Sequence, residues 1–184
     1  MESLVQVVSM RDYFRLCVQH SFEDLGLGGE TEIATPYLTD LLVRFAEADH
    51  VTPPGADGAP LVSVADRLAE IQRVWALDGP LFDPAREIEI SRQLGDYTLF
   101  MSGFFWERVR DMAASRHYTR VGRRAYRVVA EHHRAAGSED ALVFRALSER
   151  FIRYAGVLTY MREVYVGANF APWPHRLFAR IITE

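Results

Sequence analysis

The chain has 184 residues, of which 49% are apolar and 12% aromatic, and its formal net charge is −4. A chain of this length normally forms one domain, and this composition supplies one dense core and excludes an intrinsically disordered protein. Because Cys17 is the only cysteine, a disulfide framework and a cysteine zinc cluster within one chain are also excluded. The N-terminal MESLVQVV is unlike a signal peptide and no apolar run is long enough to span a bilayer, so we expect a cytoplasmic protein without membrane segments.

The charged residues are distributed unevenly between the two halves of the chain. Residues 1–92 contain 7 arginines and 16 acidic residues, whereas residues 93–184 contain 14 arginines and 9 acidic residues; there is no lysine. Such asymmetry fits a nucleic-acid or acidic partner, or two halves that face each other and neutralise within one fold. The net negative charge favours internal neutralisation, because a nucleic-acid-binding protein of this size is usually basic overall.

Capping signals predict two helices in the first 50 residues. Ser9 with Asp12 resembles a capping box, and it opens an apolar-periodic segment that continues to Phe22 and ends at a group of glycines. Thr35 followed by Pro36 predicts the start of the second helix, because proline suits the first helical position.

The segment VTPPGADGAP, residues 51–60, is the clearest loop signal in the chain. We interpret it as a surface loop and not as a domain boundary, because the preceding 50 residues are too few for a core of their own. Ser63 with Asp66 then predicts the start of a third helix, which runs to about Leu77.

Asp83 and Pro84 form a cap-plus-proline start that leads into the most apolar stretch of the sequence, residues 86–112. This stretch is apolar almost all the way round, which is typical of the central helix of a helical domain. Gly95 either divides the central helix or marks a close contact between helices, and the sequence leaves both interpretations open. A narrow polar stripe remains: Glu89, Arg92, Asp96, Glu107 and Arg110.

Two more long helices complete the prediction. One contains Tyr118 and ends at Gly137, and the next is capped by Ser138. The tail, residues 168–184, is expected to dock on the bundle. No strand-like alternation persists beyond the first eight residues. The predicted fold class is therefore all-α: a single domain over residues 1–184, with six or seven helices around the central apolar helix.

The polar stripe of the central helix is the first candidate site. A carboxylate such as Asp96, if buried among aromatic side chains, would have its neutral form favoured and could act as an acid or base. The alternative is a solvated edge held by helix-surface ion pairs, such as Glu107 with Arg110. We favour the solvated edge, because pairs at this spacing are common on exposed helix faces.

Histidines give weak support for a metal or haem site. His132 and His133 are adjacent on one helix, so their side chains diverge by about 100° and do not point at one ion. Histidines near a helix C-terminus interact favourably with the last carbonyl groups, and this is the preferred interpretation. Glu47-x-x-His50 has the form of a di-iron motif, but no second copy exists. We therefore expect no metal and no cofactor.

Arginines form a row on the helix that contains Tyr118. Such a row could contact phosphates, the acidic first half of the chain or a second subunit. We do not expect nucleic-acid binding, because no aromatic residues are interleaved with the row and no recognition-helix signature accompanies it. The members of this row are Arg120, Arg123, Arg124, Arg127 and Arg134.

Two function classes remain, because the sequence contains no nucleophile elbow, Walker loop or dinucleotide fingerprint. The first is a non-enzymatic interaction or regulatory module that binds a protein partner or self-associates. The second is a bundle that binds a small apolar or aromatic ligand, with or without catalysis, between its central and C-terminal helices. The candidate ligand-binding residues are Asp96, Tyr97, Tyr118, His132 and Tyr154.

Overall fold

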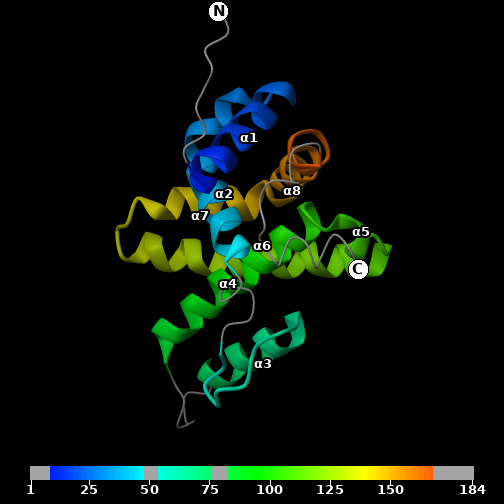
Figure 1. The fold of residues 1–184 in the computed structure, drawn as a ribbon. Helices are drawn as coiled ribbons and strands as arrows, with labels where there is room; N and C mark the ends of the chain where they lie inside the picture. The colour runs from blue at the N-terminus through cyan, green and yellow to red at the C-terminus, as the bar shows by residue number, and fades with distance from the viewer. Residues whose placement is uncertain (1–8, 48–53, 76–82, 168–184) are drawn as a thin grey trace, which may run out of the picture.

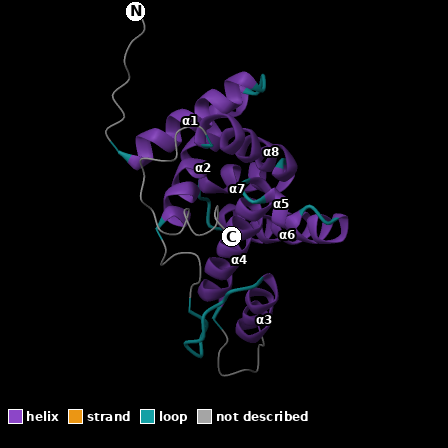
Figure 2. Cartoon of the chain, turned by 45° about the vertical axis from the view of Figure 1, so that its right-hand side comes forward, coloured by secondary structure: helices purple, strands orange, loops and turns teal. Residues whose placement is uncertain are grey.

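The computed structural model describes residues 9–47, 54–75 and 83–167. These residues form eight α-helices. They contain no strand (Figure 2), and an isolated bridge joins Pro54 to Pro60. The predicted all-α fold class is therefore confirmed, but the described residues form eight helices where six or seven were predicted, and the last long helix that was predicted is divided in two at Arg150. The predicted docking of residues 168–184 lies outside the described residues. None of the described helices is long and apolar enough to cross a membrane.

The α-helices, in chain order, are α1 (Met10–Asp24), α2 (Thr31–Ala46), α3 (Val64–Trp75), α4 (Pro84–Gly103), α5 (Trp106–Val109), α6 (Met112–Ala135), α7 (Asp140–Glu149) and α8 (Phe151–Met161). A 3₁₀ turn, Gly28–Glu30, precedes α2, and a π-helical turn, Arg162–Val166, follows α8.

Side-chain caps start three helices where the sequence predicts them. The Ser9 hydroxyl accepts a hydrogen bond from the backbone N–H of Asp12 at the start of α1. Ser63 and Asp66 bond reciprocally at the start of α3, as a capping box does. The Asp83 carboxylate accepts bonds from two backbone N–H groups at the start of α4, directly before a proline at the first helical position.

The predicted start of α2 is wrong. The helix begins at Thr31, directly after the 3₁₀ turn, and Pro36 lies inside it. Proline removes one hydrogen bond to a carbonyl group four residues earlier. Helical structure persists through this position because the flanking residues Ala34, Thr35 and Leu38 are buried against the core, and tertiary packing outweighs the local preference.

The apolar stretch 86–112 is divided, but not at Gly95. Helix α4 ends at Gly103, and the following turn places Phe104 and Phe105 in the core, where each is at most 3% exposed. Gly95 lies inside α4, where an added Cβ would be 2.7 Å from the ring of Tyr126. Gly95 therefore marks a close helix contact, which is the second of its two interpretations.

Helix α4 passes through the middle of the molecule and packs most extensively against α6, which pairs with α7 (Figure 1). Helices α1, α2 and α8 lie on one side of the α6–α7 pair, and α3 lies on the other, against the first half of α4. The main core lies between α1, α2, α4, α6, α7 and α8, and a smaller apolar cluster joins α3 to α4 and α6. The largest fully buried apolar and aromatic side chains include Phe14, Phe22, Tyr126, Phe151 and Tyr154.

Candidate functional site

Asp96 is the centre of a buried hydrogen-bond network, and it is only 3% exposed. Its Oδ1 accepts hydrogen bonds from the hydroxyls of Tyr37 at 2.6 Å and Tyr126 at 2.8 Å. Its Oδ2 accepts hydrogen bonds from Arg44 at 2.9 Å and Arg92 at 3.4 Å. Gly95 permits this arrangement, because its missing side chain lets the Tyr126 ring lie against α4. The carboxylate therefore joins α2, α4 and α6.

The preferred sequence interpretation, a solvated edge, is wrong for Asp96. The i,i+4 pair with Arg92 forms, but the closest partners come from α2 and α6, which residue spacing within α4 does not reveal. The predicted pairing of Glu107 with Arg110 is also replaced, because Glu107 binds Arg162 at 2.6 Å instead. Three of the four hydrogen bonds to Asp96 tie side chains of α2 and α6 to α4.

The two tyrosines of this network should make the protein sensitive to alkaline pH. Burial, reinforced by the neighbouring Asp96 carboxylate, raises the pKa of Tyr37 and of Tyr126 well above the ordinary value of 10.0. The unfolded chain ionises both hydroxyls above about pH 10, while the native protein keeps them protonated. Their contribution to stability is thus present below this pH and is lost as the pH rises further. Urea unfolding at a series of alkaline pH values should show this decline, and Tyr126→Phe should make it shallower; an unchanged pH slope would contradict the assignment.

The other four candidate ligand residues lie in three different places: Tyr97 and Tyr118 are together, Tyr154 is elsewhere in the core, and His132 is at the end of α6. Tyr97 and Tyr118 are neighbours, with ring centroids 6.3 Å apart, and the guanidinium of Arg67 from α3 lies 4.2 Å from the Tyr97 ring centroid. Tyr154 is buried beside Phe22 of α1. The structure therefore brings together two of the five residues, and the apolar-ligand pocket stays a prediction.

His132 and His133 both lie in the last turn of α6, as the helix-terminus interpretation predicts. His132 is exposed, and the His133 ring stacks on Phe144 with ring centroids 5.1 Å apart. Of the Glu47-x-x-His50 motif, His50 lies outside the described residues. Within the described residues, no three His, Cys, Asp or Glu side chains are grouped so as to hold a metal ion.

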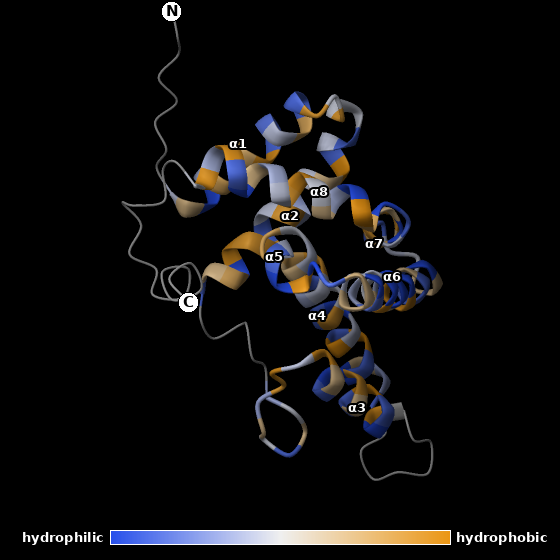
Figure 3. Cartoon of the chain, turned by 90° about the vertical axis from the view of Figure 1, so that its right-hand side faces the viewer, coloured by the Kyte–Doolittle hydropathy of each residue, from blue (hydrophilic) through white to orange (hydrophobic). Residues whose placement is uncertain are grey.

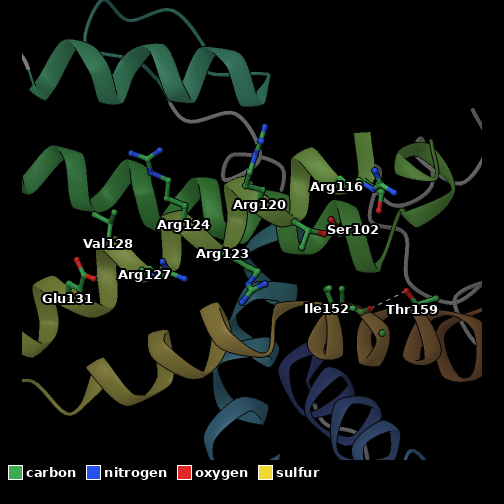
Figure 4. Close-up of a pocket in the computed structure, with 14 residues that line it drawn as sticks. Ser102, Arg116, Arg120, Arg123, Arg124, Arg127, Val128, Glu131, Ile152 and Thr159 are labelled. Atoms are coloured by element: carbon green, nitrogen blue, oxygen red, sulfur yellow. Dashed lines mark hydrogen bonds between the residues drawn. The ribbon is translucent and has the colours of Figure 1, made fainter. Parts of the chain in front are cut away.

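A groove of about 920 Å³ lies between α6 and α8 and is lined by many arginines; it is hereafter called the arginine groove (Figure 4). Positions three and four apart lie on one helix face, so α6 lines this groove with a continuous row of basic side chains. Glu131 is the one acidic residue among the described residues that line it. Arg134 of the sequence-predicted row does not line the groove, whereas Arg116 does. The arginines that line it, hereafter the arginine row, are Arg116, Arg120, Arg123, Arg124 and Arg127.

The other wall and the floor of the arginine groove are small or apolar. Ile152 of α8 is 67% exposed, and Ala155 and Gly156 follow it along the same wall. An added Cβ at Gly156 would meet no atom within 4 Å, so the groove is open above this residue. At the floor, the buried Oγ of Ser102 has no hydrogen-bond partner in the described part of the chain.

Most of the arginine row is not neutralised. Within the part of the chain that the structure describes, Arg123 alone of these arginines has a close side-chain hydrogen-bond partner: its Nε donates to the Ser148 carbonyl at 3.0 Å and thereby ties α6 to α7. Arg116, Arg120 and Arg124 are exposed and form no ion pair or side-chain hydrogen bond with any described residue. In Figure 3, α6 accordingly carries many hydrophilic residues. Each like-charge pair at this spacing costs about 0.2–0.5 kcal/mol, so the row lowers stability.

Internal neutralisation of the two halves, the preferred sequence interpretation, is seen only in part. Arg150 and Arg153 reach Glu30 of the first half, and Arg44 reaches Asp96 of the second. The arginine groove takes no part in these pairs. The sequence reveals its basic row through helical periodicity, but the wall formed by α8 depends on tertiary packing and was not predicted.

Comparisons with protein-family models, with curated proteins and with solved structures gave no significant match to this chain.

Proposed function

We propose that this protein is a non-enzymatic interaction module that binds an acidic segment of a partner protein in the arginine groove. The observation that carries the proposal is the row of arginines without ion pairs along one wall of an open groove. Guanidinium groups bind carboxylates through two parallel hydrogen bonds, which gives both affinity and orientation.

The apolar wall favours a peptide with a mixed surface. Ile152, Val128 and Ala155 line the same groove as the arginines. An amphipathic helix could pair glutamate or aspartate along one edge with the arginines and pack aliphatic side chains of its neighbouring edge against the apolar wall, as in other helix-in-groove complexes. Gly156 adds room for close approach, because glycine lets another backbone come near.

Nucleic acid fits this groove less well than an acidic peptide does. Single-stranded nucleic acid is held by aromatic side chains that stack on its bases, and no aromatic residue is among the described residues that line the groove. Glu131 places negative charge inside the groove, and the whole chain has a net charge of −4. Both features oppose a polyanion whose charge is continuous.

Charge reversal in the groove should abolish peptide binding and leave the fold intact. The probe is a labelled amphipathic model peptide with glutamate on one face and leucine on the other, followed by fluorescence anisotropy. Arg120→Glu combined with Arg124→Glu should weaken binding at least about tenfold, because each lost charged contact typically costs more than 1 kcal/mol. Binding to the unmodified protein should also weaken with added salt.

Two arginines outside the groove provide a matched control. Arg110 and Arg134 are exposed, do not line the arginine groove, and form no side-chain ion pair with any described residue. Arg110→Glu combined with Arg134→Glu makes the same change in net charge and should leave peptide affinity within about twofold. An equal loss of peptide affinity in both double variants would mean that net charge alone causes the effect, which would contradict the proposal. Tighter binding of a DNA oligonucleotide than of the peptide would also overturn it.

Filling the groove provides an independent test that leaves its charge unchanged. Gly156→Leu places a side chain in open space on α8 and also replaces a poor helix former with a good one. Peptide binding should fall at least about tenfold by steric exclusion, while the melting temperature holds or rises. Retained affinity in a folded Gly156→Leu protein would place the peptide elsewhere.

A further inference from the structure

A second groove of opposite character lies between α2, α4 and α7, hereafter the acidic groove. Its volume is also about 920 Å³. Acidic side chains outnumber the two residues in its lining that can carry positive charge, Arg92 and His133. These acidic residues are Glu32, Asp40, Glu89, Glu139 and Asp140.

The charge of the acidic groove is only partly neutralised. Asp40 pairs with Arg11 at 2.5 Å, Glu89 pairs with Arg92 at 2.8 Å, and Asp140 lies 3.9 Å from His133. Glu32 and Glu139 are exposed and pair with no described residue. A partner therefore meets at least two carboxylates that are free to accept bonds from guanidinium groups.

Aliphatic side chains extend from the acidic groove into solvent. Ile33 of α2 is 40% exposed, and Leu142 of α7 is 65% exposed. Exposed aliphatic residues inside a charged rim are typical of a surface that binds another protein. The arginine groove has the same plan with the opposite charge, because Ile152 stands beside its arginines.

We propose that a second copy of this chain is the acidic partner: the arginine groove of one molecule docks on the α2–α7 rim of the acidic groove of another. This inference rests on the proposed function and names the partner. The contact would place Arg120 and Arg124 near Glu32 and Glu139 of the second copy, and Ile152 near Leu142.

One molecule does not bring its own two grooves together. Helix α6 contributes to both, since Arg120 and Arg124 line the arginine groove whereas Val129 and His133 line the acidic groove. Positions on one rigid helix keep a fixed separation and direction. Opposite charges that are held apart within a molecule attract across two molecules, and they attract most strongly at low salt.

The contact joins two different surfaces, so it is heterologous. Such contacts close into a ring or continue as an open chain of subunits. Sedimentation velocity and native mass spectrometry of the full chain should therefore show multiples of the 21.0 kDa monomer. Their proportion should rise with protein concentration and fall with added salt.

Complementary variants test the proposed contact directly. Arg120→Glu with Arg124→Glu removes the basic surface, and Glu32→Arg with Glu139→Arg removes the acidic one. Each variant alone should remain monomeric. An equimolar mixture should associate again, because the acidic groove of the first variant meets the arginine groove of the second and the two reversed surfaces are complementary as well. Circular dichroism of each variant verifies that it is folded, and association that occurs only in the mixture is itself evidence that the surfaces are intact.

The outcomes separate this inference from the proposed function. If the unmodified chain is monomeric at every concentration and at low salt, a second copy is not the partner, whereas peptide binding that depends on Arg120 and Arg124 would still support the proposed function. If the chain self-associates but the mixed variants do not, the association uses other surfaces and this inference is wrong. If peptide binding is independent of the arginines, the proposed function fails whatever the oligomeric state.

Discussion

Replacing Asp96 with alanine should lower the free energy of unfolding by about 3–5 kcal/mol, the usual cost of removing one partner from a buried ionic network. The substitution leaves the hydroxyls of Tyr37 and Tyr126 and the guanidinium of Arg44 without their acceptor. A typical domain is stable by about 5–15 kcal/mol, so this loss is a large fraction of the total. Urea denaturation followed by circular dichroism measures it directly.

Two conservative variants show whether the cost comes from the network. Tyr126→Phe keeps the ring against Gly95 and removes one hydrogen bond, so it should cost about 1 kcal/mol. Asp96→Asn keeps one carbonyl acceptor and should fall between Tyr126→Phe and Asp96→Ala. A loss of less than about 1 kcal/mol in Asp96→Ala would show that these donors find other partners, and it would remove the carboxylate as the junction of α2, α4 and α6.

The features that the sequence predicts correctly depend on residues close together in the chain. Ser9, Ser63 and Asp83 cap helices because each side chain bonds to a backbone N–H two or three residues later. The basic row on α6 is likewise visible from spacing, since three- and four-residue steps place arginines on one face of any helix. Local bonds and helical geometry need no knowledge of the fold.

The features that the sequence does not predict depend on packing between distant segments. Asp96 is buried because Tyr37 and Tyr126, which are 59 and 30 residues away, meet it there. Helix α2 starts before Pro36 because its flanking residues are packed in the core. The groove exists because α8 lies opposite α6, and nothing near Arg120 in the chain indicates that Ile152 will face it.

Two helical glycines should respond in opposite directions to the same substitution. Gly122 of α6 is buried, and a Cβ there would lie 2.4 Å from both Phe151 Cε2 and Thr98 Oγ1. Both neighbours are at most 1% exposed, so neither side chain has space into which it can move. Gly122→Ala should therefore force α6 away from α4 and α8, at a cost of about 1–3 kcal/mol for overpacking.

Gly156→Ala is the matched change in open space. An added Cβ on α8 meets no atom within 4 Å, so only helix propensity changes, and stability should rise by about 0.5–1 kcal/mol. Thermal unfolding of the two variants beside the unmodified protein measures both signs in one experiment. Equal destabilisation would contradict the packing of α6 on Phe151 and the openness of the groove above Gly156. Opposite signs would mean that the glycine at position 122 is needed for the fold, whereas the one at position 156 lowers stability.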